Sequence, residues 1–426
     1  MLASAPMRYA EIIAVGSELL VGGRLDTNSL FLTERLGVLG IEVRWKSIVG
    51  DDEHDIADAL RASRRRADVI LVTGGLGPTR DDLTREAVAR AAARPLRRQP
   101  DAVDAIVGRL KGWGRVPTGR QLRQAFLPKG SEMLENPVGT APGFSFRWSG
   151  RFVAVLPGVP REAEQMFDVA VAPKLATTSD ARLDRRVIHT FGLIEAEVDR
   201  RLAGVVTART EISLGFLASP LGVMVSVTAL GQPSLIRPRL DKAVHTIKRR
   251  LGRYVFAEGA DTMEEVIGRQ LAQRGLTLAL AESCTGGLIG HRLTQVPGSS
   301  AYFDRGVICY SNAAKTDLLG VSRGLLARHG AVSAEVARAM AEGVRMRSHT
   351  QIGLSVTGVA GPGGGSERKP VGLVYIGLDA RGGRGTRTTP ISKEFRFHGD
   401  RATIKSRAAQ AALNLLREWL VDSITQ

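Results

Sequence analysis

The sequence predicts an α/β protein in which two α/β domains are joined by a small α+β domain. Short apolar runs that end in glycine-rich turns and lead into helices occur in the first third of the chain and again in the last third. The region between them has strand-like segments followed by a long basic helix, without the same alternation. A chain of 426 residues is long enough for several domains. We place them at residues 1–172, 173–258 and 259–426.

The first domain alternates buried strands with helices. Residues 11–15 form an apolar run that stops at Gly16, and the polar residues 27–29 are expected to cap a helix that ends at Gly40. Further strands are expected at 41–45 and 67–72, and further helices at 55–66 and 81–93. This order is typical of an open sheet with helices on both faces.

The second domain contains no chemical motif. Strands are expected at 186–191, 211–217 and 222–230, with a helix from Glu195 and a basic helix over 238–251. Its role is that of a connector, a dimerisation element or a weak nucleic-acid surface, and the first two are favoured.

The third domain returns to the α/β pattern. A helix over 263–274 and a strand over 276–281 precede a glycine-rich helix start, and Ser333 is expected to cap a later helix. Further strands are expected at 306–309, 352–357 and 372–378.

The composition excludes several classes of protein. No run of 18 apolar residues predicts a membrane span, and the first eight residues lack the pattern of a secretory signal. Two cysteines form neither a disulfide framework nor a zinc motif, so we expect a cytoplasmic protein. The net charge of +16 suggests a polyanion as partner, but only ten of the 59 basic residues are Lys, which favours Arg-rich codon usage, and we expect no nucleic-acid partner.

Three polar clusters follow strand ends in the first domain and predict a phosphate site. Glycines, here Gly74, Gly75 and Gly77, allow backbone N–H groups to approach a phosphate. Carboxylates suit a divalent metal, Mg²⁺, that bridges to phosphates. The clusters contain these residues: Glu18, Thr27, Asn28, Asp51, Thr79, Asp81 and Asp82. The alternative is that the glycines serve only the turns and the acids only cap helices.

Ser283 in the third domain is a candidate nucleophile. It lies where a buried strand gives way to a helix start with Gly286 and Gly287, which would surround its hydroxyl with N–H donors. No histidine is suitably placed, so Lys315 is the candidate base, with Tyr310 orienting the pair or relaying the proton. Cys284 is a rival nucleophile, and the alternative is that Ser283 is only a helix cap.

The first domain resembles the molybdopterin-binding domains of the MoaB/MogA type. The resemblance rests on residues 73–79 and 81–86, and residues 136–144 and 156–160 point to one branch, the CinA (competence/damage-inducible) family. It implies a divalent-metal-dependent pyrophosphatase for ADP-ribose-like compounds, with Asp51 and Asp82 in metal or phosphate work and Glu18 and Asp81 assisting. Asn136 and Gly158, from these motifs, are expected at the substrate. Leu122 stands where the family often has Asn, which puts one substrate contact in doubt.

The third domain resembles the nicotinamide-nucleotide amidase domain that ends CinA proteins. The matching segments are 281–287, 297–303, 305–312, 329–333, 357–362 and 369–372. The implied reaction converts nicotinamide mononucleotide and water to nicotinic acid mononucleotide and ammonia, without a metal. By position, Ser283 is the nucleophile and Lys315 the base with Tyr310. The substrate residues would be Gly286, Gly287, Thr357, Gly358, Gly361 and, as a phosphate contact, Arg401.

These observations predict a bifunctional hydrolase of pyridine-nucleotide metabolism. Its partners would be nicotinamide mononucleotide, ADP-ribose and NAD-derived dinucleotides, and the resemblance implies a homodimer. The alternatives are a molybdopterin-binding or adenylylating protein, and a competence-linked nucleic-acid binder.

Overall fold

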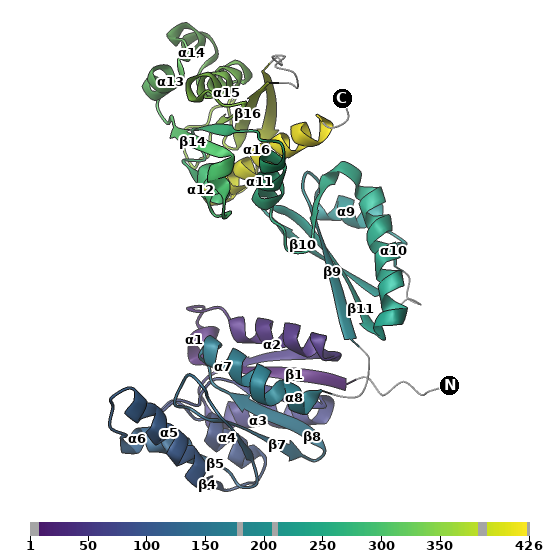
Figure 1. The fold of residues 1–426 in the computed structure, drawn as a ribbon, viewed down its shortest axis with the longest axis vertical. Helices are drawn as coiled ribbons and strands as arrows, with labels where there is room; N and C mark the ends of the chain where they lie inside the picture. The colour runs from purple at the N-terminus through teal and green to yellow at the C-terminus, as the bar shows by residue number, and fades with distance from the viewer. Residues whose placement is uncertain (1–7, 177–181, 207–211, 382–389, 424–426) are drawn as a thin grey trace. The chain divides into compact units, whose positions relative to one another are not determined.

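The computed structural model describes residues 8–176, 182–206, 212–381 and 390–423. The chain forms two compact units, Met1–Arg185 with Thr228–Arg239 and Arg186–Val227 with Leu240–Gln426 (Figure 1). The described residues contain a six-stranded, a four-stranded and a five-stranded sheet, besides one two-stranded pair. The predicted α/β class with a different, smaller middle domain is confirmed.

The N-terminal sheet has the strand order β2-β1-β3-β8-β7-β6. Its strands are β1 (Arg8–Val15), β2 (Ile41–Val49), β3 (Val69–Thr73), β6 (Glu132–Leu134), β7 (Gly143–Trp148) and β8 (Arg151–Leu156). Strands β2, β1, β3 and β8 run parallel to one another. Strand β7 pairs antiparallel with β8, and β6 pairs antiparallel with β7. The parallel strands therefore end at one edge, where ligands bind in open α/β sheets.

Helices cover both faces of this sheet (Figure 1). They are α1 (Ser17–Leu20), α2 (Thr27–Val38), α3 (Glu53–Arg66), α4 (Thr84–Ala91), α5 (Pro100–Gly112), α6 (Gly119–Leu122), α7 (Pro160–Met166) and α8 (Ala172–Leu175); β4 (Leu96–Arg98) and β5 (Phe126–Pro128) form the separate pair. Successive residues of β1 point to opposite faces, so Ile12 packs in the cluster with Leu36 of α2, and Ile13 in the cluster with Leu60 of α3.

Three helix starts of this domain differ from the prediction, and the first is that of α3, which begins at Glu53 and not at residue 55. The cap of α2 is Asp26, whose carboxylate accepts from the N–H of Ser29, so residues 27–29 form the first turn instead of the cap. Helix α4 begins at Thr84 and not at residue 81. The carboxylate of Asp82 accepts from the N–H groups of Gly77 and Thr79, and so closes the preceding loop in place of joining a helix.

The middle domain has a four-stranded sheet in the order β10-β11-β9-β12. Its elements are β9 (Arg182–Thr190), α9 (Glu195–Leu202), β10 (Ile212–Ser219), β11 (Gly222–Gly231), α10 (Pro233–Leu251) and β12 (Val255–Glu258). The predicted strand over 211–217 is observed from Ile212, while Glu211 lies outside the described residues. Helix α10 begins five residues earlier than predicted and contains Pro238 in its interior.

The C-terminal sheet has the order β14-β13-β15-β16-β17, with the first three strands parallel and the last two antiparallel. The strands are β13 (Leu278–Glu282), β14 (Phe303–Ile308), β15 (Ile352–Gly358), β16 (Leu373–Ala380) and β17 (Ile391–Arg396). The helices are α11 (Met263–Gln273), α12 (Leu288–Thr294), α13 (Asn312–Leu319), α14 (Arg323–His329), α15 (Ala334–Ser348) and α16 (Arg401–Asp422). Strand β17 and helices α13, α14 and α16 are additions to the prediction.

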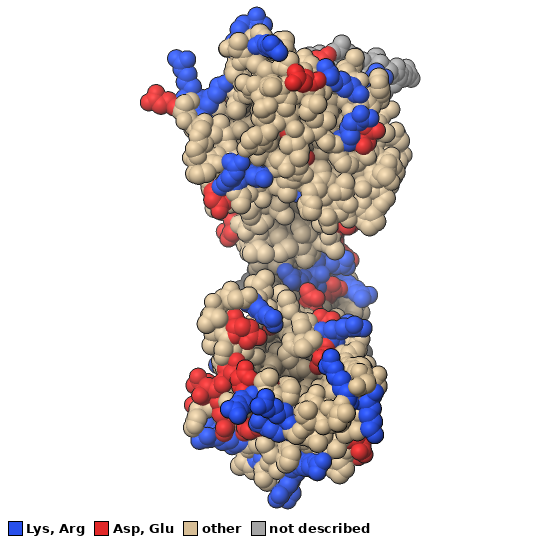
Figure 2. Space-filling view, turned by 90° about the vertical axis from the view of Figure 1, so that its left-hand side faces the viewer, with Lys and Arg blue, Asp and Glu red and all other residues tan. Residues whose placement is uncertain are grey.

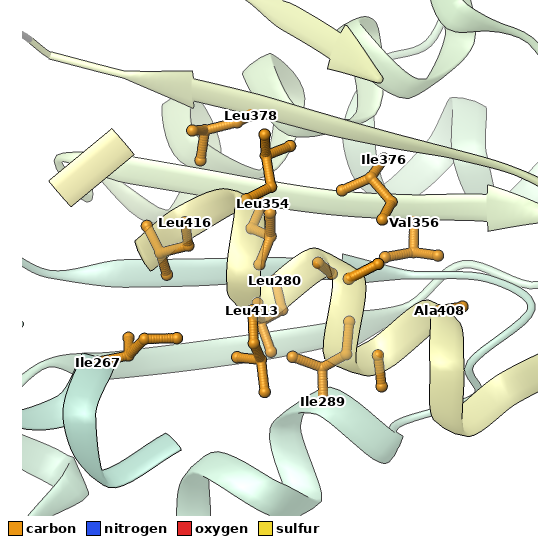
Figure 3. Packing of buried hydrophobic residues seen from close by; sticks show 14 of the residues in the cluster. Ile267, Leu280, Ile289, Leu354, Val356, Ile376, Leu378, Ala408, Leu413 and Leu416 are labelled. Atoms are coloured by element: carbon orange, nitrogen blue, oxygen red, sulfur yellow. The ribbon is translucent and has the colours of Figure 1, made fainter. Parts of the chain in front are cut away.

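Helix α16 supplies much of the core of this domain. Figure 3 shows Leu413 and Leu416 of α16 packed against Leu280 of β13 and Leu354 of β15, with Ile289 of α12 beside them. A second cluster on the other face joins β13 to α15. Among the described residues, no helix is long and apolar enough to span a membrane.

Candidate functional sites

The segment that carries Ser283 is a tight turn between β13 and α12. The N–H of Ser283 donates to the Val356 carbonyl at 3.0 Å, which continues the sheet up to the serine itself. The buried carboxylate of Glu282 then accepts from the N–H groups of Gly287, Ile289 and Gly290 at 2.8–3.2 Å. These bonds fix the path of the turn, because they occupy N–H groups that a helix start otherwise leaves unpaired.

The structure brings Ser283 and Lys315 together. Lys315 Nζ lies 3.1 Å from Ser283 Oγ, and it donates to the carbonyls of Cys309 at 2.9 Å and Tyr310 at 3.3 Å. Lys315 is only 1% exposed, and burial lowers the pKa of its ammonium group. The two carbonyls occupy two of the three hydrogen-bonding directions of the Lys315 amine, and the third direction points to the serine hydroxyl. This is the arrangement that a base needs to accept the proton of Ser283.

The pKa of the Cys284 thiol, the rival nucleophile, is shifted in the opposite direction to that of Lys315. Burial raises the pKa of the Cys284 thiol to about 12, and that of Cys309 to about 11. Both are therefore thiols at neutral pH, whereas a cysteine nucleophile reacts as thiolate. This favours Ser283 over Cys284.

The backbone beside Ser283 offers donors for an oxyanion. The N–H groups of Cys284 and Thr285 lie in the turn between strand and helix, and neither donates to a carbonyl of the described residues. The hydroxyl of Thr285 is also buried without a partner among the described residues. These groups are available to stabilise negative charge next to the nucleophile.

Tyr310 contributes its carbonyl and its hydroxyl to different contacts. The carbonyl holds Lys315, while the exposed phenol accepts from Arg401 Nη2 at 2.8 Å. Arg401 Nη1 also donates to the Gly361 carbonyl at 2.6 Å, so these three predicted residues meet at one point. The phenol thus has its hydrogen bond with Arg401 and not with the Ser283–Lys315 pair.

Thr357 and Gly358 form the end of β15. The Thr357 hydroxyl is buried and donates to the Ala331 carbonyl at 2.8 Å. A Cβ atom at Gly358 would lie 2.7 Å from the Leu373 carbonyl, so that position requires glycine for packing. These contacts hold the strand end beside its neighbours.

The carboxyl ends of the N-terminal strands surround a cavity of 520 Å³. The predicted residues that line it are Glu18, Asp51, Gly74, Gly75, Gly77, Asp81, Asp82 and Gly158. Three separate clusters of the sequence therefore meet in one cavity, as expected for the edge at which parallel strands end.

The glycine-rich loop of this cavity is held from below by a buried cation. Arg85 is 1% exposed and donates to the carbonyls of Leu76 and Gly77, and burial lowers the pKa of its guanidinium. Asp82 accepts from the N–H of Gly77 at 2.8 Å on the other side of the loop. A Cβ atom at Gly77 would lie 2.4 Å from Asp82 Oδ2, so only glycine allows this approach.

Four predicted residues lie outside the cavity lining. Asn28 donates to Thr73 Oγ1 and to the Gly158 carbonyl, and so ties two strand ends together. Asn136 bonds both to its own turn and to Glu162 at 2.7 Å. Thr79 contacts Asp82, and Thr27 is exposed at the start of α2.

The acidic residues of the cavity suit a metal that is shared with a substrate. Among the described residues, no three His, Cys, Asp or Glu side chains are close enough to hold a metal by themselves. Asp51 accepts one bond, from the Ser17 N–H, whereas Asp82 is occupied by Gly77 and Thr79. Mg²⁺ commonly takes one or two carboxylates and completes its shell with water and substrate phosphate, so this donor set fits it.

Sequence reasoning missed several residues at these sites. Glu162 lines the first cavity from the start of α7, and its signal was a carboxylate just after the 156–160 motif. Lys405 of α16 approaches Gly286, since a Cβ atom there would lie 3.6 Å from Lys405 Nζ. Neither the position of Lys405 nor the hydrogen bonds of Glu282 and Arg85 could be predicted from the local sequence, because each depends on contacts that form only in the folded chain.

Comparison with known families assigns all three domains. Residues 11–177 match a "probable molybdopterin binding domain", residues 185–257 the "damage-inducible protein CinA KH domain", and residues 260–420 the "CinA C-terminal domain". A CinA-like protein of Acidobacterium capsulatum is 42% identical over 422 residues, with 97% of this chain and all of the relative covered.

Solved structures match the chain over a shorter span. A competence/damage inducible protein of Agrobacterium tumefaciens is 41% identical, covers 37% of this chain and 96% of its own, and has a TM-score of 0.34. The CinA protein of Thermoplasma acidophilum is 36% identical, covers 40% and 98%, and has a TM-score of 0.38. The full-length match to a relative and the three family models in order lead to one conclusion: this chain belongs to the CinA, or competence/damage-inducible, family.

Proposed function

We propose that the C-terminal domain is an amide hydrolase that converts nicotinamide mononucleotide to nicotinic acid mononucleotide and ammonia. The supporting observation is the buried Lys315 amine, 3.1 Å from Ser283 Oγ at a strand-to-helix turn. A buried lysine next to a serine hydroxyl, with no carboxylate of the described residues contacting it, matches the Ser–Lys variant of the catalytic triad. The substrate is taken from the resemblance stated above.

The geometry supports a two-step reaction. Lys315 as neutral amine accepts the Ser283 proton while Oγ attacks the amide carbon, and the N–H groups of Cys284 and Thr285 bind the oxyanion. The tetrahedral intermediate collapses, the C–N bond breaks, and the lysine proton passes to the leaving ammonia. This leaves the acyl group as an ester on Ser283 Oγ. Water then attacks this ester, and Lys315 accepts a proton from the water and returns it to Ser283 Oγ. No cofactor takes part in these steps.

Ammonia release from nicotinamide mononucleotide tests this proposal. Ser283→Ala and Lys315→Ala should each lower kcat by on the order of 10⁴-fold, because nucleophile and base act as one unit. Cys284→Ala, at the adjoining residue, is the matched control and should keep activity within a few-fold. Full activity in Ser283→Ala would overturn the mechanism.

We further propose that the N-terminal cavity hydrolyses the pyrophosphate of ADP-ribose or of related NAD-derived dinucleotides. Its glycine-rich loop and its acidic lining suit phosphate and a divalent cation, Mg²⁺. Asp51 and Glu18 would hold the metal, with Asp81 assisting. The metal would supply charge for the phosphate oxygens, and Asp82 positions the loop through Gly77 and Thr79.

Metal-dependent cleavage of ADP-ribose is the corresponding measurement. Asp51→Asn should lower the rate at least about 100-fold at limiting Mg²⁺, because it removes a charged ligand, with partial recovery at high Mg²⁺. Asp58→Asn, on the exposed side of α3, is the control. Cleavage that proceeds unchanged in excess chelator would contradict the metal proposal.

Two other functions are distinguished by direct binding. The first domain matches molybdopterin-binding proteins, so calorimetry with a pterin tests that alternative. The middle domain matches a KH model, but residues 185–257 contain no G-x-x-G segment, the loop with which KH domains clamp nucleic-acid backbone. We therefore favour a connector or dimerisation role for it, in a cytoplasmic homodimer.

A further inference from the structure

A further cavity, of about 240 Å³, lies within the C-terminal unit, between the sheet of the middle domain and the C-terminal domain. One wall comes from β9, β10, β11 and β12, and the other from the chain that leads into α11, from α12 and from α16. Its lining contains none of the residues that surround Ser283, so it is separate from the proposed amidase site.

The walls of this cavity are mainly apolar. Leu217 and Leu221 lie at its rim with 58% and 47% of their surface exposed, whereas Met263 in the other wall is buried. Phe256 lies beside the His189 ring, with 5.6 Å between the ring centroids. An apolar ring in the cavity would therefore remove exposed leucine surface from water, which favours its binding.

Three polar side chains meet in the wall formed by the C-terminal domain. Arg292 Nη2 donates to the Glu264 carboxylate and to Gln410 Oε1, both at 2.7 Å. The two charges of the ion pair are only 12% and 14% exposed. A guanidinium group has no acceptor, so the Gln410 amide must turn its oxygen toward Arg292 and its NH₂ group away from it.

The NH₂ group of Gln410 is an unused donor. Gln410 lines the cavity and is 1% exposed, and no described residue accepts a hydrogen bond from its Nε2. A buried donor without a partner is unfavourable, and an acceptor atom of a bound molecule would satisfy it. The Glu264 oxygens each have a further lone pair besides those used by Arg292, so they are available to a donor of the same molecule.

The charges around the cavity disfavour an anion. Arg292 is already neutralised by Glu264, and Asp261, the other acid of the lining, pairs with Arg269. A carboxylate placed next to Gln410 would therefore meet the Glu264 oxygens without a cation of its own. A primary carboxamide suits both groups, because its oxygen accepts from Gln410 and its NH₂ group donates to Glu264.

We propose that this cavity binds a small neutral aromatic carboxamide. The ring lies between the rim leucines and Met263, and the amide lies against Gln410 and Glu264. A volume of about 240 Å³ is below the range for drug-sized ligands, so the molecule has a single ring. Because the two walls come from different domains, the bound molecule stabilises their packing. This inference depends on neither of the proposed activities.

Calorimetry of the full-length protein with benzamide as the probe tests the site. A dissociation constant on the order of 0.1–1 mM is expected for a ligand of this size. Benzoate, which has the same ring but a negative charge and no N–H, should bind at least about tenfold more weakly. Benzamide should also raise the temperature of thermal unfolding.

Two variants locate the binding. Gln410→Leu removes the donor and should weaken benzamide binding roughly tenfold. Leu217→Ser removes apolar surface from β10, in the other domain, and should weaken it roughly fivefold. Leu217 is largely exposed, so this variant should keep the wild-type fold even if Gln410→Leu does not. Gln295→Leu makes the first substitution at an exposed residue outside the cavity, is the matched control and should bind as the wild type.

Each other outcome counts against the site. Absence of benzamide binding to the wild type would refute it. Binding that Leu217→Ser leaves unchanged would place benzamide elsewhere, the Ser283 site included. Benzoate binding as tightly as benzamide would overturn the assignment of a carboxamide.

Discussion

Lys315 shows how burial changes the protonation of an ordinary residue. An exposed lysine is protonated at neutral pH and cannot accept a proton. At 1% exposure, with two carbonyls as partners and no carboxylate contact within the part of the chain that the structure describes, the charged form loses hydration without an ion pair in return. The same loss of hydration lowers the pKa, so more of the amine is neutral and able to accept a proton.

This predicts the pH dependence of ammonia release. The neutral amine is the active form, so kcat/KM should rise with pH through the Lys315 pKa, which burial places below the usual 10.5. Between the folded and unfolded pKa values the unfolded chain binds more protons, so stability should also rise with pH over that interval. A pH–rate profile of the wild type, with thermal unfolding of Lys315→Met as the comparison, measures both. A rising limb at or above the usual lysine value would contradict it.

The structural roles of other charged residues were also missed from the sequence, because burial and pairing depend on contacts made by the fold. Arg66 reads as part of a solvated run of arginines, yet it makes two bonds to the fully buried carboxylate of Glu11 and lies over the ring of Trp45. Glu11 itself reads as part of an apolar strand. Residue type predicts exposure on average. A charged residue whose partner is distant in the sequence, however, cannot be recognised as buried from the residues next to it.

At the scale of elements, strand-to-helix turns were the most predictable features. Ser283 and Gly74 both follow apolar runs, and parallel strands that end at one edge must bring such turns together. Helix α16 was harder to predict. Residues 408–417 are buried without a break, so the helix has no clear polar face with which a 3.6-residue period is recognised.

The missed helix limited what could be said of the C-terminal site. Arg401 was assigned by resemblance alone, and Lys405 was not assigned at all. Their proximity to residues 286, 310 and 361 depends on how α16 packs on the sheet. Local pattern offered Ser283 and Lys315 as candidates and located the glycine turn, but it gave no sign of the side chains that α16 brings near them.

The N-terminal turn makes a prediction at this scale. Gly74 has a φ of +109°, and a Cβ atom there would lie 2.1 Å from the Val15 carbonyl. Gly74→Ala should therefore destabilise the first unit by about 2 kcal/mol or more and reduce pyrophosphate cleavage. Gly108→Ala, within α5 and with nothing within 4 Å of the added atom, should instead be neutral or stabilise by up to about 1 kcal/mol. Thermal unfolding of the two variants compares them, and equal melting temperatures would show that the turn relaxes freely.

For the whole molecule, the charge of +16 first suggested a polyanion partner. On the face shown in Figure 2, Lys and Arg side chains stand singly or in small groups, and Asp and Glu side chains lie among them. Some arginines make structural contacts: Arg85 and Arg345 are buried, the latter paired with buried Asp379, and Arg66 pairs with buried Glu11. Some of the arginines therefore have structural roles, and Arg401 and Lys405 add positive charge where α16 meets the Ser283 turn.

The two proposed sites lie in different compact units and share no residue, which predicts that their activities are separable. Ser283→Ala should abolish ammonia release and leave ADP-ribose cleavage within about twofold of the wild type, and Asp51→Asn should do the reverse. Measuring both reactions on the same preparations tests this, because a folding defect would lower both together. A loss of both activities in a variant that unfolds at the wild-type temperature would instead reveal coupling, and would mean that one site depends on the state of the other.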